Sequence, residues 1–468
     1  MNAQFGVIGL GVMGRSIARN LAQKGFQLSL YNRHVAGKEE NIARDLQAAH
    51  PELAAALPFD DLADFVESLP KPRKILIMVN AGEATDAVMN DIWPLLSAND
   101  ILIDGGNAHY KDTQKRIEKA EKADIHWLGC GISGGEKGAL EGPSIMCGGH
   151  VEAYQQVEHI LTAIAARDNN GTACCAYIGK GGAGHFVKMV HNGIEYAEMQ
   201  LIAEVYSMIY HGMLLPNAQA AEVFLAWMDG DESSYLLEIS AAILQKKEGE
   251  KDLIDQILDK AGNKGTGSWA TIAAAELGVP ATMITTALFA RYISGQKAER
   301  INAENLFPKE TFNTDQANTK QLKKAYRFAR LINHHQGFEL LKAASETYQW
   351  QLNMAEIARI WTSGCIIRSV LMELLAQKLK KYPEPLAIPY FQKKLLKTET
   401  SVFEVMAEAN FAGIPIPCIS EAHQYFMSLR TANGSANMLQ AQRDYFGAHT
   451  YKRKDDPDGK NWHTDWEL

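Results

Sequence analysis

A short stretch near the middle of the chain, KMVHNGIEYAEMQ at residues 188–200, carries side chains of the kinds that exchange protons. At about 100° per residue, Lys188, His191, Asn192, Glu195 and Tyr196 fall on one arc of the expected helix. The opposite face is an ordinary apolar stripe. An exposed face would hold mostly Lys, Glu, Gln and Ala, so this selection of side chains points to a function.

Lys188 and Glu195 indicate which chemistry that function would use. They are separated by about two helical turns, or ~10 Å along the axis, so they could serve different atoms of one extended substrate. A lysine desolvated in a cleft can lose its proton near neutral pH and act as a base. A glutamic acid there can keep a proton and donate it. We expect Asn192 to hold a hydroxyl and Tyr196 an anionic group. The alternative is an exposed, helix-stabilising face with Lys188 reaching into solvent.

The N-terminus carries a glycine pattern typical of a dinucleotide site. A short apolar strand is expected at 5–10, with Gly9, Gly11 and Gly14 in the spacing GxGxxG. A helix at 15–25 and a strand at 27–33 follow, which is the context that the motif requires. Such glycines let a pyrophosphate approach the N–H groups of a helix N-terminus. A tight strand–helix turn without a ligand is the alternative.

The end of the second strand favours NADP as the cofactor. NAD sites usually place Asp or Glu there to hold the ribose 2′-hydroxyl, whereas this chain has Asn32, Arg33 and His34. The Arg33 guanidinium could clamp a 2′-phosphate and stack on the adenine. The alternative is that Arg33 is a solvated loop cation.

Further apolar strands alternate with helical patterns in the first half of the chain, which predicts a parallel, doubly wound sheet. These strands are expected at 74–79, 100–107 and 125–133. Each ends in a segment that contains glycine: VNAG (79–82), GGN (105–107) and SGG (133–135). Because ligands bind at the carboxyl ends of such strands, we expect the three segments to share a rim with the phosphate loop. Plain turns could explain any one of them.

Helical periodicity dominates the second half, and the Gly cluster of GKGGAGHFVK (179–188) marks the expected domain boundary. AEVFLAWMDG (221–230) matches AEIARIWTSG (355–364), which predicts a duplicated helical unit. The second copy, around 333–348, lacks the polar face of the first, so we expect chemistry in the first copy and packing or dimerisation in the second. The polar, aromatic-rich C-terminus is expected to dock onto something, with a frayed tail as the alternative.

The composition limits the class of protein. A chain of 468 residues, 46% hydrophobic and 22% charged, can bury a large core in two or three domains. A net charge of −8 favours neither nucleic acid nor an anionic membrane as partner. No segment approaches the ~20 apolar residues of a membrane span, and the N-terminus lacks a signal-peptide pattern. Six scattered cysteines without metal-ligand spacing predict a reduced, cytosolic protein without a metal.

Six motifs, in order along the chain, resemble those of the decarboxylating 6-phosphogluconate dehydrogenases: VIGLGVMG, DGGN, GISGGEKGALEGPSIMCGG, GHFVKMVHNGIEY, GNKGTGSW and QRDYFGAHTY. They run from the first strand to the tail, and the length resembles the long, dimeric form of that family. The related 3-hydroxyisobutyrate dehydrogenases are shorter and lack the last motif. The resemblance implies oxidation of 6-phosphogluconate at C3 with NADP, loss of CO2 and formation of ribulose 5-phosphate, the pentose phosphate pathway reaction, without a metal.

The resemblance also implies a role for each candidate residue. Lys188 would be the general base at the C3 hydroxyl, and Glu195 the acid that protonates C1 of the enediol. The sugar acid would be held by Asn107, Ser133, Gly134, Gly135, His191 and Asn192. The phosphate would be held by Tyr196, Lys264, Arg291, Arg443 and His449. Taken singly, Lys264, Arg291 and Arg443 would be interpreted as surface cations. The cofactor would contact Gly9, Leu10, Gly11, Val12, Met13, Gly14, Asn32, Arg33, His34, Val79, Asn80, Ala81 and Asn107.

The implied architecture has three parts. Residues 1–178 would form a Rossmann-type NADP-binding domain, and 179–434 a helical domain for substrate binding and dimerisation. Residues 435–468 would form a tail that carries Arg443 and His449 into the partner subunit of a homodimer. The only other partner expected is the small-molecule substrate.

Three residues depart from the pattern of that family. His34 stands where Ser or Thr is usual, Asn80 where Lys is usual, and Ala108 where Ser is usual. The first two lie beside the expected 2′-phosphate, so dual or NAD-leaning use stays open, although no acidic replacement is evident. A dehydrogenase for another 3-hydroxy acid and a catalytically silent nucleotide-binding paralogue are the alternative functions. The phosphate-binding set argues against the first, and intact Lys188 and Glu195 argue against the second.

Overall fold

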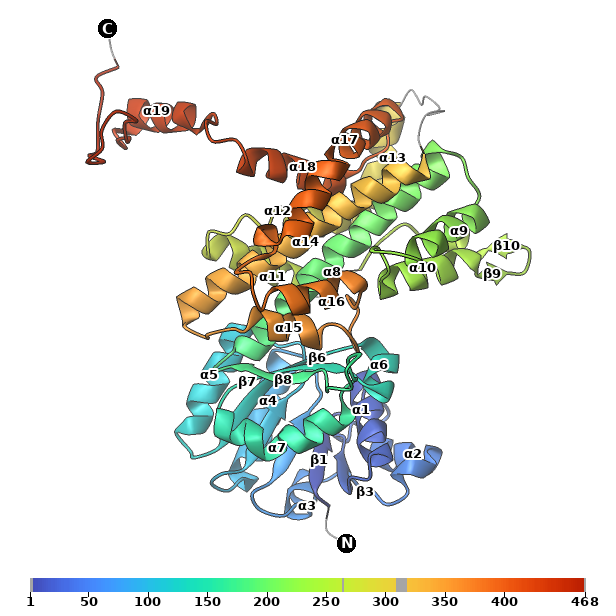
Figure 1. Cartoon of the computed structure of the whole chain (residues 1–468). Coiled ribbons are helices and arrows are strands. Elements are labelled where there is room, and N and C mark those ends of the chain that lie inside the picture. The colour runs from blue at the N-terminus through green and yellow to red at the C-terminus, as the bar shows by residue number, and fades with distance from the viewer. Residues whose placement is uncertain (1–2, 263–264, 309–317, 467–468) are drawn as a thin grey trace.

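An eight-stranded sheet forms the N-terminal part of the protein, in a computed structural model that describes residues 3–262, 265–308 and 318–466 (Figure 1). The strand order is β3-β2-β1-β4-β5-β6-β7-β8. The strands are β1 Phe5–Ile8, β2 Leu28–Tyr31, β3 Leu57–Phe59, β4 Lys74–Ile77, β5 Ile101–Asp104, β6 His126–Ser133, β7 Ser144–Gly148 and β8 Cys175–Gly179. The order reverses on either side of β1, which confirms the predicted doubly wound, Rossmann-type fold class.

The sheet departs from the prediction at one edge. All neighbours from β3 to β6 are parallel, but β7 runs antiparallel to β6, and β8 is parallel to β7. The connection from β6 to β7 holds only the short helix α6, Gly135–Glu141. A parallel crossover needs a dozen or more residues, so a connection of this length returns the chain antiparallel.

Helices cover both faces of this sheet. Buried apolar residues of α1, α2, α6 and α7 form one core with the strands, and those of α3, α4 and α5 form a second core on the other face. The bounds are α1 Val12–Gln23, α2 Ile42–Ala49, α3 Leu62–Glu67, α4 Glu83–Ile92, α5 Tyr110–Glu121 and α7 Val151–Ile164. The first helix therefore begins at Val12 and not at the predicted residue 15, so the glycine motif itself forms its first turn.

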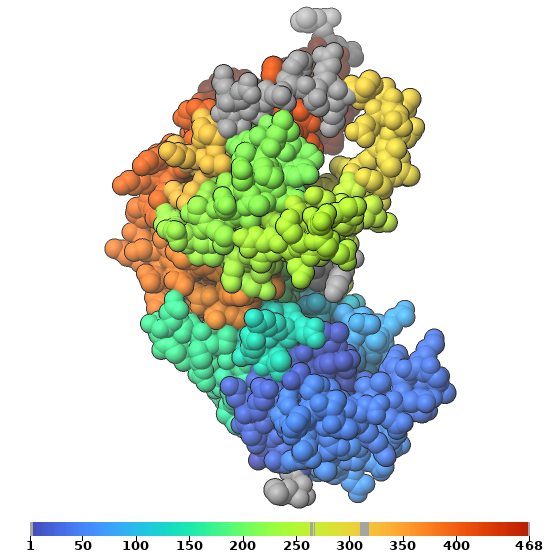
Figure 2. All heavy atoms as spheres, turned by 90° about the vertical axis from the view of Figure 1, so that its right-hand side faces the viewer, coloured from blue at the N-terminus to red at the C-terminus, as the bar shows by residue number. Residues whose placement is uncertain are grey.

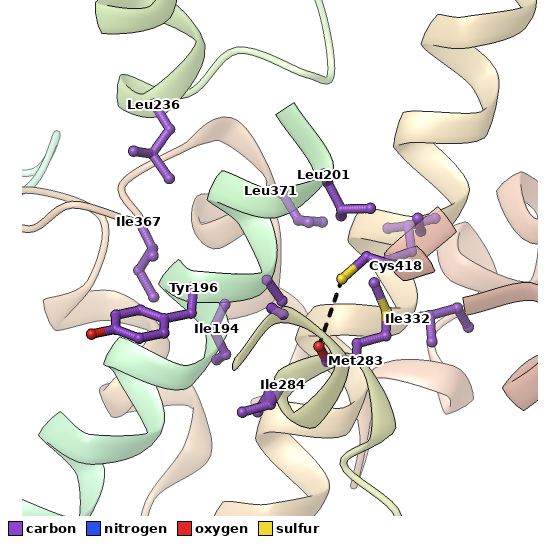
Figure 3. Packing of buried hydrophobic residues seen from close by; sticks show 14 of the residues in the cluster. Ile194, Tyr196, Leu201, Leu236, Met283, Ile284, Ile332, Ile367, Leu371 and Cys418 are labelled. Carbon is purple, nitrogen blue, oxygen red and sulfur yellow. Dashed lines mark hydrogen bonds between the residues drawn. The ribbon is translucent and has the colours of Figure 1, made fainter. Parts of the chain in front are cut away.

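A large helical domain follows the sheet and is centred on two long helices, α8 and α14, which pack against each other (Figure 1). In Figure 3, Ile194 and Leu201 of α8 lie among apolar side chains of α12, α14 and α18. The helices are α8 Ala183–Ser207, α9 Asn217–Met228, α10 Tyr235–Gln245, α11 Thr266–Glu276, α12 Thr282–Gly295, α13 Lys297–Leu306, α14 Thr319–Tyr348, α15 Met354–Ile360, α16 Val370–Lys378, α17 Pro389–Phe411, α18 Pro417–Leu429 and α19 Ala436–Gly447. A two-residue hairpin pair, β9 Lys247–Glu248 and β10 Lys251–Asp252, lies between α10 and α11.

The order of helices repeats as an internal duplication predicts. A long helix, a shorter one and a serine-capped one occur as α8, α9 and α10 and again as α14, α15 and α16. Ser234 Oγ caps α10 through Leu237 N, and Ser369 Oγ caps α16 through Met372 N. The two serines also pair in an antiparallel bridge, so the copies meet at equivalent positions.

Helix α8 joins the two domains. Its first turns pack directly on strands β6 and β7, and its later turns enter the core of the helical domain. The approach to the sheet needs glycines, because a Cβ on Gly131 would collide with the Lys188 side chain and one on Gly184 would collide with strand carbonyls. The glycine cluster that suggested a domain boundary therefore also positions the polar face of α8 against the sheet.

The C-terminal segment leaves the body of the protein after α18. In Figure 1, α19 and the residues after it extend away from the rest of the chain. The segment has order of its own, since the buried Asp444 carboxyl accepts hydrogen bonds from Thr450 N, Thr464 N and Trp466 Nε1. A frayed tail is therefore excluded.

Two cysteines differ from the sequence expectation. Cys130 of β6 and Cys147 of β7 lie opposite each other in the antiparallel pair and form a disulfide, with their Cα atoms 4.1 Å apart. The prediction of reduced cysteines is wrong for this pair. The register of β6 and β7 brings the two cysteines together, and their spacing in the sequence did not indicate that they would be neighbours. Cys174, Cys175, Cys365 and Cys418 are free thiols. Of the helices that the structure describes, none has the length and apolarity to cross a bilayer.

Candidate active site

The polar face of α8 is buried, so the alternative of an exposed helix face is excluded. Lys188 is 6% exposed and His191 fully buried, and Asn192 and Tyr196 are also buried. Glu195 is half-buried on the next turn. Burying a charge without a fixed partner is unfavourable, so this arrangement has to be explained by function more than by stability.

The side chains on this face contact one another. Lys188 Nζ donates to Asn192 Oδ1 at 2.8 Å and lies 3.5 Å from His191 Nδ1. The same ring nitrogen lies 3.6 Å from Glu195 Oε2, so one nitrogen of His191 is close to both the amine and the carboxyl. On its other side, His191 Nε2 lies 3.2 Å from the hydroxyl of buried Ser133. One imidazole therefore links the helix to the end of strand β6.

Burial shifts the proton affinities of the three titratable groups in the directions that the chemistry requires. Desolvation lowers the pKa of Lys188 from its ordinary value of 10.5, against smaller opposing effects of Glu195 and Cys365. Desolvation raises the pKa of Glu195, and the charges of Lys188 and Arg291 oppose this only in part. Burial and the Lys188 charge hold the pKa of His191 well below 6.5, so the imidazole is neutral. A neutral amine and a protonated carboxyl are the forms in which a base and an acid act.

Residues at the strand ends meet this face from the N-terminal domain. Ser133 ends β6, and Gly134 and Gly135 follow it with positive φ at the start of α6. A Cβ on Gly134 would lie 2.8 Å from the Gly364 carbonyl oxygen, so only glycine fits there. Asn107 is exposed in the loop after β5. Of the predicted sugar-acid set, contacts to the α8 face are seen for Ser133, His191 and Asn192.

Two predicted phosphate ligands are also brought together. The guanidinium of Arg291, on α12, stacks 3.6 Å from the ring centre of Tyr196. Arg291 Nη1 also donates to the carbonyl oxygen of Gly262, so the loop before α11 contacts the same guanidinium. Gly267 allows the ring of Tyr196 to approach α11, because a Cβ there would lie 2.7 Å from it. Lys264 belongs to this loop but lies outside the described residues.

The remaining two phosphate candidates are on the C-terminal segment. Arg443 is exposed on α19, where its guanidinium donates to Gln440 Oε1, and His449 is exposed just after that helix. Figure 1 shows this segment extended away from the domain that carries α8. Within one chain, these two residues are therefore not part of the site around Lys188.

The glycine motif forms a cradle at the start of α1. Gly9 has φ +87° and a Cβ on it would lie 2.7 Å from the Met78 carbonyl oxygen; Gly14 packs against the Gly9 carbonyl. Gly11 is the N-cap of α1 and, having no side chain, does not cap the N–H groups of the first turn, which includes Val12 and Met13. Leu10 N donates to Asn32 Oδ1, which ties the cradle to the end of β2. Free N–H groups at a helix N-terminus fit the pyrophosphate of a dinucleotide.

A cavity of about 290 Å³ lies beside this cradle. It is lined by Gly9, Gly11, Asn32, Arg33, Val79 and Asn80 of the predicted cofactor set, among others. His34 follows Arg33 and is exposed, Ala81 follows Asn80 after β4, and Asn107 follows β5. The predicted cofactor residues therefore gather at the carboxyl ends of β1, β2, β4 and β5. In Figure 2 the surface is hollowed between the N-terminal domain, in blue and cyan, and the helical domain, in yellow-green.

One residue at this cavity was missed by the sequence analysis. Glu39 lines it and accepts hydrogen bonds from both Arg33 and Asn32. An acidic residue therefore lies beside Arg33, although none is evident in the sequence at the strand end itself. The position of Glu39 in the sequence did not indicate that it would contact Arg33, because it lies several residues after the end of β2. A turn closed by a bridge between Val35 and Glu39 brings it back to the strand end.

Comparisons with known proteins agree with this geometry. Residues 4–179 match the family model described as the NAD binding domain of 6-phosphogluconate dehydrogenase, and residues 184–466 match that of the 6-phosphogluconate dehydrogenase C-terminal domain. The chain is 44% identical to "6-phosphogluconate dehydrogenase, decarboxylating" of Staphylococcus aureus (strain N315), over 100% of this chain and 99% of the relative. The Lactococcus lactis subsp. lactis (strain IL1403) enzyme of the same name is also 44% identical, over 99% and 98%.

A solved structure is similar over the whole chain. It is that of Plasmodium falciparum 6-phosphogluconate dehydrogenase, described in its apo form, with its cofactor NADP+ and with its substrate 6-phosphogluconate. The TM-score is 0.93 at 38% sequence identity, and the match covers 99% of this chain and 100% of that one.

Proposed function

This chain belongs to the 6-phosphogluconate dehydrogenase family, and from that premise we propose that it converts 6-phosphogluconate and NADP to ribulose 5-phosphate, CO2 and NADPH. The observation that carries the proposal is the buried group of Lys188, His191, Asn192 and Glu195, in which desolvation shifts the amine and the carboxyl toward their neutral forms. A helix without a reaction to perform would gain nothing from burying these groups together.

Lys188 is the base in this proposal. Its neutral amine takes the proton of the C3 hydroxyl, and Asn192 and His191 hold the amine in place through the contacts described above. Bound NADP supplies the hydride acceptor for C3. The resulting 3-keto acid is a β-keto acid, and the Lys188 ammonium, next to the new carbonyl, stabilises the negative charge that develops there as CO2 departs.

Glu195 is the acid that completes the reaction. It lies about two turns after Lys188 on α8, and both groups lie near Nδ1 of His191, so we expect it to face a different carbon of the same substrate. Its raised pKa keeps the proton on the carboxyl until C1 of the enediol needs it. The reaction can therefore begin with deprotonation of the C3 hydroxyl by Lys188 and end with protonation of C1 by Glu195.

The substrate's phosphate would bind at the Tyr196–Arg291 stack. A guanidinium supplies a planar fork of donors that suits a phosphate, and its partial burial strengthens the attraction. We propose Lys264, from the adjacent loop, as a further cation. Asn107, Ser133, Gly134 and Gly135 would hold the carboxylate end and the hydroxyls from the sheet side.

The remaining phosphate ligands require a second subunit. We propose a homodimer in which the tail of one chain brings Arg443 and His449 to the site of the other, because the tail is ordered by Asp444 yet extends away from its own body. The division into 1–178, 179–434 and 435–468 belongs to this proposal. A cytoplasmic location is proposed from the sugar phosphate substrate.

Reduction of the nicotinamide with 6-phosphogluconate, with gluconate as the control substrate, tests the reaction. We expect turnover with 6-phosphogluconate and a rate lower by at least about 100-fold with gluconate, which lacks the phosphate and its several ion-pair contacts. Equal rates on the two substrates would contradict the phosphate site.

Complementation tests the shared site. Lys188→Ala and Arg443→Ala homodimers should each be nearly inactive. A mixed dimer should regain activity, because one of its two sites combines intact Lys188 with an intact tail from the other chain. Mixing that restores nothing would show that the tail serves its own subunit or no site.

A further inference from the structure

Glu39 is held against the two residues that were expected to recognise NADP. Arg33 Nη2 donates to Glu39 Oε1 at 2.9 Å, and Arg33 Nε lies 3.3 Å from Glu39 Oε2. Asn32 Nδ2 donates to the same Oε2 at 3.0 Å. One edge of the guanidinium fork is therefore occupied by a carboxylate of the protein, at the strand end where dinucleotide folds contact the 2′ position of the adenosine ribose.

The surroundings of Arg33 add negative charge. Asp91 lines the same cavity, so its lining carries two carboxyl groups, Glu39 and Asp91, and one guanidinium. The pKa of Tyr31, which also lines the cavity, is raised by burial and then by the charges of Asp91, Asp61 and Asp60, with Arg33 opposing them. Asn80 also lines the cavity, and its amide adds no positive charge to the lining.

This charge distribution affects the two cofactors differently. The 2′-hydroxyl of NAD can donate a hydrogen bond to a carboxylate, so Glu39 is compatible with NAD. The 2′-phosphate of NADP carries about two negative charges, which Glu39 repels. The phosphate must also displace Glu39 from Arg33 to use the Nε–Nη2 edge of the fork.

We propose that Glu39 determines the choice of cofactor by occupying Arg33, so that the enzyme accepts NAD as well as NADP. The inference rests on the proposed function only in placing the adenosine ribose at this cavity. Glu39 has no role in the proton transfers of α8, so its effect is confined to cofactor binding.

Titration of NADPH and NADH against the full-length protein, followed by nicotinamide fluorescence, tests the inference. The variants are Glu39→Gln, which keeps the size and removes the charge, and Glu40→Gln as the matched control. Glu40 is the neighbouring carboxyl; it accepts from Gly37 N, and among the described residues Arg33 pairs with Glu39 instead. We expect Glu39→Gln to tighten NADPH about fivefold to twentyfold and to change NADH less than about twofold, as removal of a charge at this range predicts. Glu40→Gln should change neither more than about twofold.

Two results would overturn the inference. One is an unchanged ratio of NADPH to NADH affinity in Glu39→Gln. The other is weaker NADPH binding in that variant, which would show that Glu39 orients Arg33 for the phosphate. Since no substrate is present in these titrations, a failure here stays separate from a failure of 6-phosphogluconate turnover.

Discussion

The two long helices of the helical domain each bury a cation, and the two cations behave in opposite ways. On α14, Arg330 Nε lies 2.7 Å from Glu198, which also accepts a hydrogen bond from the hydroxyl of Tyr326. Burial alone would lower the pKa of Arg330, but the charges of Glu198, Tyr326 and Glu232 outweigh it and raise that pKa. On α8, burial prevails at Lys188 and lowers its pKa.

The difference shows how to separate a structural charge from a reactive one. Arg330 has the carboxyl of Glu198, which is also buried, at ion-pair distance. Among the described residues, the hydrogen-bond contacts of Lys188 Nζ are with an amide oxygen and a neutral ring, and no ion pair is formed with a carboxyl. A buried ion pair that is complete holds the fold, whereas a buried amine that lacks a direct counter-charge is available to accept a proton.

The largest effect is expected from removing the amine of Lys188. Lys188→Met should lower kcat by at least about 1,000-fold, since general base catalysis contributes up to 10⁴-fold. Cofactor affinity should stay within about twofold, because no residue of the cradle changes. Steady-state kinetics and NADPH titration measure the two quantities. A kcat within tenfold of the wild-type value would contradict the assignment of Lys188 as the general base.

The same substitution on α14 should act on stability. Arg330→Met leaves Glu198 buried without its counter-charge and should lower the free energy of unfolding by about 3–5 kcal/mol. Lys188→Met, as the matched variant, should leave that free energy unchanged or raise it. Urea unfolding of both variants provides the comparison. Equal destabilisation by the two would contradict the distinction between the cations.

A smaller effect is expected at the carboxyl of α8. Glu195→Gln cannot donate a proton to C1 and should lower kcat by about 100-fold. Because Glu195 is the group that transfers the proton at C1, the exchange of the C1 hydrogen of ribulose 5-phosphate with solvent should slow down together with kcat. Incorporation of deuterium at C1 in deuterated water measures this proton transfer. Normal exchange in the variant would assign the proton to another donor.

The smallest effect concerns the phosphate. Arg291→Gln should raise KM for 6-phosphogluconate about tenfold and change kcat less than about threefold, because the phosphate lies away from the reacting carbons. Tyr196→Phe keeps the stacking ring and is the milder control. A fall in kcat with unchanged KM would move Arg291 to the reacting end of the substrate.

Periodicity and spacing were sufficient to predict the parts of this protein that depend on local sequence. The α8 face, the glycine cradle and the strand-end segments were all predicted, because each depends on residues close in the chain. The Cys130–Cys147 pairing and the antiparallel β7 depend on which strands become neighbours, which spacing does not encode. Glu39 was missed for a different reason: it is close to Arg33 in the chain, but their contact depends on the turn of the loop between them, which the residue types do not indicate.

The pH dependence of kcat/KM for 6-phosphogluconate, compared between the wild type and Glu195→Gln, tests the central claim most directly. The neutral amine of Lys188 is lost as pH falls below its pKa, and the protonated carboxyl of Glu195 is lost as pH rises above its own. The wild type should therefore show a bell whose acid limb lies below 10.5. In Glu195→Gln the alkaline limb should disappear, because the carboxyl whose deprotonation causes it is gone, whereas the acid limb set by Lys188 should remain. Activity that rises up to about pH 10.5 in both proteins would show an ordinary, charged Lys188 and contradict the account.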